Sequence, residues 1–173
     1  RHRREPSPSA PAHRRGRRRL HQPGHAAGGA RESRAFRLAR PPTAGSASTV
    51  ALNRIVSEYP KCLNAISYHP YGMTSTQISN AQAFIQQNFH LPGVISEWGV
   101  SALSSNGGAE GQASKIGTFI ADVKKLNIPL TSIYEWKNSD SGSNDREKNF
   151  GLLTSDGQPK PARMTVESHF NAE

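Results

Sequence analysis

The chain has 173 residues, the length of one domain, with 34% apolar residues and a formal net charge of +9. The charge is uneven, because residues 1–46 hold twelve Arg and two Glu (net +10) whereas residues 47–173 carry a net charge of −1. No apolar run approaches the roughly 18 residues of a membrane-spanning helix. A single cysteine, Cys62, excludes a disulfide within the chain and a zinc site built on cysteines.

Residues 1–46 are rich in Arg, Ala, Pro, Gly and Ser. They contain too few apolar residues to offset the entropy cost of ordering, so we expect a disordered basic segment. Three interpretations remain open: an out-of-frame or chimeric stretch, since these residues have GC-rich codons; a linker; or a nucleic-acid-binding tail. The third rests on "HRRGRRRLH" (13–21), whose five Arg could neutralise phosphates. Phe36 is the only aromatic residue of the segment, which leaves little for base stacking.

Helical and strand patterns alternate along residues 47–173. The spacing of apolar residues predicts helices over 48–60, 75–89, 112–127 and 161–170. Short apolar runs predict strands within 62–72, 93–97 and 130–136. Loops are expected at 106–112 and 137–149, and an extended segment with a turn at Asp156-Gly157 over 150–161.

Strands that alternate with helices of this length pair in parallel through right-handed crossovers, which predicts an α/β fold. Three such strands cannot close a barrel, which needs eight. We therefore expect the strands near 62–68 and 130–136 to be unpaired edges.

Polar and aromatic side chains gather where the three predicted strands end, and parallel α/β folds build their sites at that edge. An indole can stack on the apolar face of a sugar ring, and a carboxylate beside it can attack the anomeric carbon. This pattern indicates carbohydrate cleavage. The residues concerned are Tyr68, His69, Tyr71, Glu97, Trp98, Glu135, Trp136 and Asn138.

Each residue also has a purely structural explanation. Glu97 alone would be interpreted as a solvated or helix-capping carboxylate, His69 as a hydrogen-bonded core histidine, and Trp136 as packing. Their coincidence at one edge of the sheet is what favours a site.

Three segments, "AISYHPYG" (65–72), "VISEWGVS" (94–101) and "SIYEWKNSDSGSNDREKNFGLLTSDGQPKPA" (132–162), resemble the last strands of clan A glycoside hydrolases. The similarity is greatest to the cellulase-type family 5 and to family 39. It implies that residues 47–173 are the C-terminal part, about three βα units, of a (β/α)8 TIM barrel. It also implies a retaining enzyme for β-linked polysaccharides, with no cofactor or metal, whose parent is extracellular or periplasmic.

The resemblance assigns roles by position. Glu97 matches the nucleophile, and His69 and Tyr71 match a His-x-Tyr pair in which the Tyr orients that nucleophile. Trp136 matches a tryptophan beneath the sugar, and Asn138 is expected near the substrate. Trp98 is expected either to contact the substrate or only to pack behind the nucleophile.

The Asn-Glu-Pro type motif that carries the family's acid/base Glu is absent from this chain. We therefore expect a fragment that is weakly active or inactive alone. A non-catalytic carbohydrate-binding remnant is the first alternative, and an Arg-rich nucleic-acid-binding protein is the second.

Overall fold

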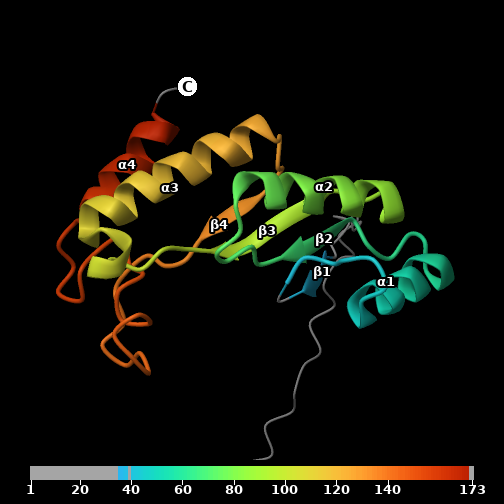
Figure 1. Cartoon of the computed structure of the whole chain (residues 1–173), viewed down its shortest axis with the longest axis horizontal. Coiled ribbons are helices and arrows are strands. Elements are labelled where there is room, and N and C mark those ends of the chain that lie inside the picture. Colours follow the sequence, from blue (N-terminus) through green and yellow to red (C-terminus); the bar gives the residue numbers. More distant parts are fainter. Residues whose placement is uncertain (1–34, 39, 172–173) are drawn as a thin grey trace, which may run out of the picture. The chain divides into compact units, whose positions relative to one another are not determined.

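The computed structural model describes residues 35–38 and 40–171, which contain a four-stranded parallel sheet. The strand order is β1-β2-β3-β4, so each strand lies beside its neighbour in the sequence (Figure 1). This is the arrangement that repeated right-handed βα units produce, and it confirms the predicted α/β class. The strands are β1 (Ala35–Leu38), β2 (Ala65–Tyr68), β3 (Gly93–Trp98) and β4 (Thr131–Ile133).

Four α-helices and one short 3-10 helix connect or follow the described strands. Two begin with clear local signals: Thr74 forms a capping box with Gln77, and Pro161 occupies the first turn of the last helix. The helices predicted at 75–89 and 161–170 are confirmed at both ends. The elements are α1 (Ala47–Glu58), α2 (Ser75–Phe89), η1 (Ser104–Asn106), α3 (Gly108–Lys125) and α4 (Pro161–Phe170).

The predicted loop at 106–112 is wrong from Gly108 onward, because α3 begins at that residue. Gly107 precedes it with a φ of 88°, a conformation that glycine adopts without steric cost. A side chain on Gly111 would collide with the backbone of Asn106. These glycines allow the chain to turn sharply into the helix, although a glycine-rich sequence on its own is typical of a loop.

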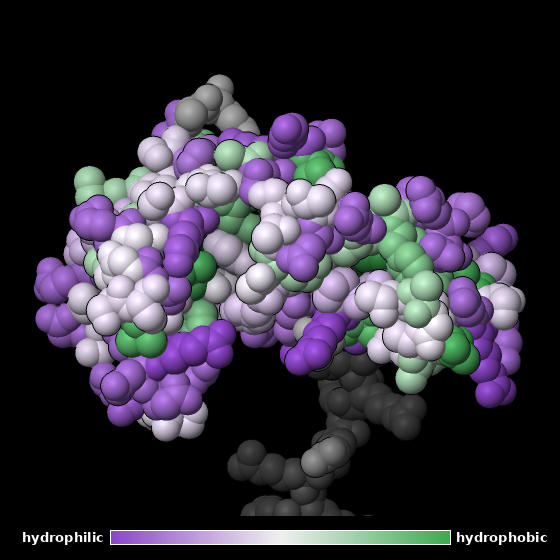
Figure 2. Space-filling model, in the orientation of Figure 1, coloured by the Kyte–Doolittle hydropathy of each residue, from purple (hydrophilic) through white to green (hydrophobic). Residues whose placement is uncertain are grey.

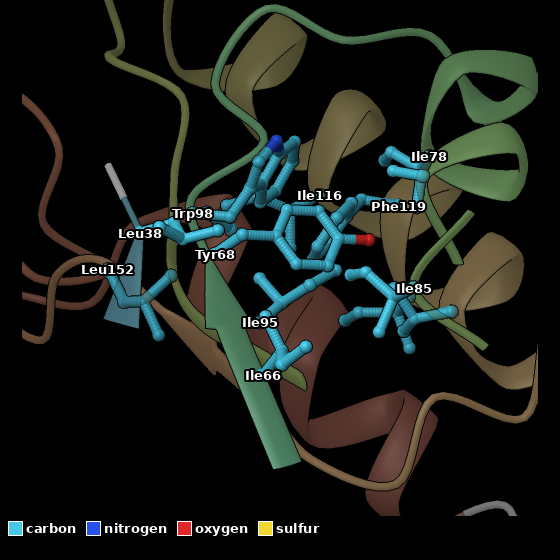
Figure 3. Close-up of a cluster of buried hydrophobic side chains, with 14 of the residues drawn as sticks. Leu38, Ile66, Tyr68, Ile78, Ile85, Ile95, Trp98, Ile116, Phe119 and Leu152 are labelled. Carbon is cyan, nitrogen blue, oxygen red and sulfur yellow. The ribbon is translucent and has the colours of Figure 1, made fainter. Parts of the chain in front are cut away.

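Apolar side chains of the sheet pack against α2 and α3, which lie along the same side of the sheet (Figure 1). Figure 3 shows this cluster, in which Tyr68 and Trp98 contribute the large rings. Tyr68 is fully buried, and its hydroxyl accepts a hydrogen bond from Gln82 of α2. The cluster fixes β2 and β3, whose carboxyl ends carry the candidate site.

Strand β1 lies inside residues 1–46, where the sequence predicted no structure. It pairs in parallel with β2, and Leu38 is buried in the apolar cluster. The prediction that the strand near 62–68 is an edge is therefore wrong, and among the described strands β1 and β4 are the edges. Residues 1–34 and 39 lie outside the described residues, so most of that prediction is not tested.

Hydrophilic residues cover most of the molecular face drawn in Figure 2, where apolar residues form small separate areas. Within residues 35–38 and 40–171, no helix has the length and apolar character to cross a bilayer.

Candidate active site

His69 immediately follows β2 and is buried. Its Nε2 atom lies 3.1 Å from the hydroxyl of Ser96 on β3, and that hydroxyl accepts a hydrogen bond of 2.5 Å from Ser67. Ser67 and Ser96 therefore bridge the two neighbouring strands, on the face that alternates with the apolar cluster. This bridge fixes the imidazole at the carboxyl edge of the sheet.

Glu97 reaches the same edge because β3 contains an irregularity. Ile95 pairs with Thr131 of β4, but Trp98 pairs with Ile133, so three steps along β3 match two along β4. An extra residue of this kind is a β-bulge, which re-aims the side chains beside it. Ile95 and Trp98 consequently both join the apolar cluster, and the Glu97 side chain is turned elsewhere.

Two side chains from the end of β2 meet the Glu97 carboxylate. The Tyr71 hydroxyl donates to Glu97 Oε1 at 3.1 Å, and His69 Nδ1 lies 3.8 Å from Oε2. Burial, followed by the nearby Glu97 charge, raises the pKa of Tyr71 above its usual value. Tyr71 therefore stays protonated and remains a hydrogen-bond donor throughout the neutral range. The structure thus brings together the three residues predicted to act at the nucleophile.

Glu97 opens into a hollow of about 540 Å³. Phe150 is central to this hollow, because its ring packs edge-on against Tyr71 (centroids 6.1 Å apart) and Tyr134 (5.4 Å). The guanidinium of Arg146 lies 5.3 Å from the same ring centroid. A carboxylate beside aromatic rings suits a sugar, which has both polar and apolar faces. The lining residues are Tyr71, Glu97, Tyr134, Arg146, Glu147 and Phe150.

Buried contacts hold the two sides of this hollow together. Gly99 follows β3 where any side chain would collide with the Tyr134 carbonyl. Gln112 of α3 is fully buried, and its amide donates to the carbonyls of Val100 (2.8 Å) and Phe150 (3.0 Å). The segment after Glu97 is thereby tied to the segment that carries Phe150.

Trp98 does not contribute to the hollow, contrary to its predicted contact with substrate. It is buried, and its ring stacks on Phe119 of α3 at a centroid distance of 3.6 Å (Figure 3). The bulge explains this position, because it directs Trp98 to the helix side of the sheet. Because only 7% of Trp98 is exposed, neither face of its ring is open to a sugar, and its position agrees with the expectation that it packs behind the nucleophile.

Trp136 is 62% exposed and does not line the hollow beside Glu97. One face of its ring is approached by Arg163 of α4, whose guanidinium carbon lies 5.7 Å from the ring centroid. Trp136 therefore has exposed ring surface away from the hollow that Glu97 lines, and its predicted position beneath a sugar stays a prediction.

Asn138 forms internal hydrogen bonds instead of facing the hollow. Its Oδ1 accepts from the Gly151 backbone N–H at 2.9 Å and from the buried Lys160 ammonium at 3.4 Å. Burial lowers the pKa of Lys160 and raises that of Glu135, which interacts with it. These groups support the turn that places Phe150, and the expected contact between Asn138 and substrate stays a prediction.

Three lining residues of this hollow, Arg146, Glu147 and Phe150, were not predicted as site residues from the sequence. The sequence pattern predicts a loop over 137–149 and an extended segment that begins at Phe150. No sequence signal identifies them, because a spacing of four residues, as between Arg146 and Phe150, brings side chains together in a helix, and this segment forms turns. Among the described residues, no three His, Cys, Asp or Glu side chains are grouped as a metal site would require.

No model of a protein family matches the sequence, and no curated protein matches it. Solved structures match the fold. A family 39 glycoside hydrolase from Bacteroides cellulosilyticus is similar with a TM-score of 0.55 and 18% identity, over 70% of this chain and 30% of that one. A family 128 endo-β-1,3-glucanase from Amycolatopsis mediterranei, solved with laminaritriose and laminaribiose, gives a TM-score of 0.55 at 15% identity, over 73% of this chain and 53% of the glucanase.

An intracellular xylanase from Thermoanaerobacterium saccharolyticum gives a TM-score of 0.51 at 15% identity, over 76% of this chain and 42% of the xylanase. The chain spans about a third to a half of the length of these enzymes. Identities this low establish the fold alone. The predicted resemblance to clan A glycoside hydrolases is confirmed at that level, as is the partial TIM-barrel architecture.

Proposed function

We propose that the chain is part of a retaining glycoside hydrolase for β-linked polysaccharides, with Glu97 as the nucleophile. The observation that carries this proposal is the Glu97 carboxylate at the end of β3, held by Tyr71 at 3.1 Å and faced by His69 beside an aromatic hollow. Similar folds in a β-1,3-glucanase and a xylanase support the substrate class.

In the proposed reaction one Glu97 oxygen attacks the anomeric carbon while the bond to the departing oxygen breaks, which leaves a glycosyl ester on Glu97. The Tyr71 hydroxyl holds the other carboxylate oxygen, so the attacking oxygen keeps a fixed direction. Water then cleaves the ester and restores Glu97. Departure of a sugar alcohol also needs a proton. In the family this proton comes from the Glu of the Asn-Glu motif, which this chain lacks.

Because that acid is absent from the chain, we expect weak hydrolysis of natural polysaccharide, lower by the roughly 10²–10⁴-fold that general acid catalysis contributes. Glycosides with a good leaving group need little acid assistance. A 2-deoxy-2-fluoro glycoside of dinitrophenol should therefore label the protein covalently, and peptide mass spectrometry should place the label on Glu97. Glu97→Gln is the matched control and should remain unlabelled.

Labelling at another residue, or equal labelling of the Glu97→Gln variant, would contradict the proposal. Substantial release of reducing sugar from polysaccharide that is lost in the same variant would contradict only the expected dependence on an absent acid.

The exposed Trp136 ring supports a second candidate, a carbohydrate-binding remnant without turnover. This alternative predicts oligosaccharide binding that is lost in Trp136→Ala, together with no labelling of Glu97. The nucleic-acid alternative rests on the Arg-rich segment at 13–21, which lies outside the described residues.

A further inference from the structure

A chain of polar groups leads from the sheet to the Glu97 carboxylate. Ser67 Oγ donates to Ser96 Oγ at 2.5 Å, Ser96 Oγ lies 3.1 Å from His69 Nε2, and His69 Nδ1 lies 3.8 Å from Glu97 Oε2. Ser67 and His69 are buried, so bulk water does not compete freely for their hydrogen bonds. The order of donors and acceptors along this chain determines where the imidazole proton resides.

A neutral imidazole carries one ring proton, on Nδ1 or on Nε2. The Ser96 oxygen already accepts the Ser67 proton, so the Ser96 hydroxyl proton needs an acceptor, and His69 Nε2 lies within bonding distance. The opposite tautomer would leave the Ser96 proton without an acceptor and would point the Nδ1 lone pair at a carboxylate. Both arrangements are unfavourable in a partly buried site.

We propose that Ser67 and Ser96 hold His69 in its Nδ1–H tautomer, so that an N–H group faces Glu97. The two serines are positioning residues, because they act on the carboxylate only through the imidazole. Tyr71 and His69 then present donors to opposite oxygens of Glu97, which leaves the carboxylate one fixed orientation.

Charged and titratable side chains near His69 come from several elements of the described structure. Glu97 approaches from β3 and Tyr71 from the segment after β2, and Arg40, after β1, lines the same hollow of about 600 Å³ as His69. None of them bonds His69 Nε2, whose partner is Ser96. The tautomer should therefore depend on Ser96 more than on any of these groups.

The tautomer can be read directly from long-range proton–nitrogen spectra of the ¹⁵N-labelled full chain at neutral pH. The chain has seven histidines, and His69→Gln identifies the His69 signals by their loss. We expect a protonated Nδ1 and a bare Nε2 in the wild type. Ser96→Ala should shift His69 toward the Nε2–H form that predominates in free histidine, and Ser67→Ala should shift it less.

Ser132→Ala is the matched control, because Ser132 is an exposed serine on the neighbouring strand β4. It should leave the His69 signals unchanged, and near-ultraviolet circular dichroism should confirm that all variants fold alike. A wild-type His69 protonated on Nε2, or an unchanged tautomer in Ser96→Ala, would overturn the proposal.

The consequence for Glu97 rests on the proposed function and has its own assay. Ser96→Ala should slow labelling of Glu97 by the fluoro-glycoside about 2- to 10-fold, the range that loss of one net hydrogen bond produces. Ser132→Ala should label at the wild-type rate. The expected tautomer with no labelling in any variant would support this inference while refuting the glycosidase proposal. Labelling at wild-type rate in a Ser96→Ala variant with altered tautomer would refute the positioning role.

Discussion

Replacing Gln112 with Met tests how the candidate site is held together. The Gln112 Nε2 atom lies within hydrogen-bond distance of four backbone carbonyls, at 2.8 Å from Val100, 3.0 Å from Phe150, 3.3 Å from Gly151 and 3.5 Å from Asn149, and its two N–H groups are shared among them. Asn149 has other donors, and the Phe150 carbonyl keeps one bond of 3.5 Å. Met has nearly the same length and flexibility but no N–H, so it removes the donors and keeps most of the volume.

The energetic cost follows from the carbonyls that lose their main donor, those of Val100 and Gly151. An unsatisfied buried carbonyl costs about 1–3 kcal/mol. Part of this is offset, because Gln112 Oε1 is itself buried without a hydrogen-bond partner among the described residues and would be removed. We therefore expect the free energy of unfolding to fall by about 2.5 kcal/mol.

Urea unfolding followed by circular dichroism measures this change. With a slope of about 1–3 kcal/mol per molar urea, the midpoint should fall by roughly 0.8–2.5 M. Gln87→Met, at an exposed position of α2, is the control and should change the free energy of unfolding by less than about 0.5 kcal/mol. A loss below about 1 kcal/mol for Gln112→Met would refute the reasoning that this amide ties the two segments together.

Three further predictions concern the same region. Tyr71→Phe removes the donor to Glu97 but keeps the ring, so labelling of Glu97 should slow about tenfold, as expected for about 1.5 kcal/mol of lost orientation; an unchanged rate would contradict the role of Tyr71. In Gly99→Ala the new methyl group would collide with the Tyr134 carbonyl, so the melting temperature should fall sharply. Gly117→Ala is the control: its methyl group would lie near a Thr165 methyl group on α4, and the melting temperature should change little. Burial raises the pKa of Tyr68 to about 12 from 10.0, so the unfolded state releases the tyrosine proton at a lower pH than the folded state does. The contribution of Tyr68 to the free energy of unfolding should therefore be full below pH 10 and fall between pH 10 and 12. Unfolding experiments repeated across this range should show a flatter fall for Tyr68→Phe.

The sequence predicted helices well where local signals and periodicity agreed. The capping box at Thr74 and the apolar stripe of α2 define that helix at both ends. Strand β1 was missed because four residues, "AFRL", provide too little periodicity within an Arg-rich segment. Its pairing with β2 depends on the tertiary fold, and Leu38 becomes a buried core residue only when the apolar cluster is assembled.

Residues of the site were predicted where one short motif carried them. "YHPYG" places His69 and Tyr71 two positions apart, and the structure directs both toward Glu97. Residues supplied by the long loop after β4 were not predicted, since their approach depends on turns formed around Asn138 and Lys160. Sequence spacing alone does not show that Phe150 returns to contact Tyr71.

Regular alternation along β3 would place Glu97 on the same face as Ile95, within the apolar cluster against the helices. A carboxylate buried there without a partner would be costly, and a buried strand could not retain it. The bulge removes this conflict with one extra residue, which leaves Ile95 and Trp98 against the helices and frees Glu97 to meet Tyr71. The bulge becomes visible only in the register with β4, where Thr131 and Ile133 are two positions apart. A carboxylate and an indole can therefore be adjacent at the end of an apolar strand and still serve opposite sides of the sheet.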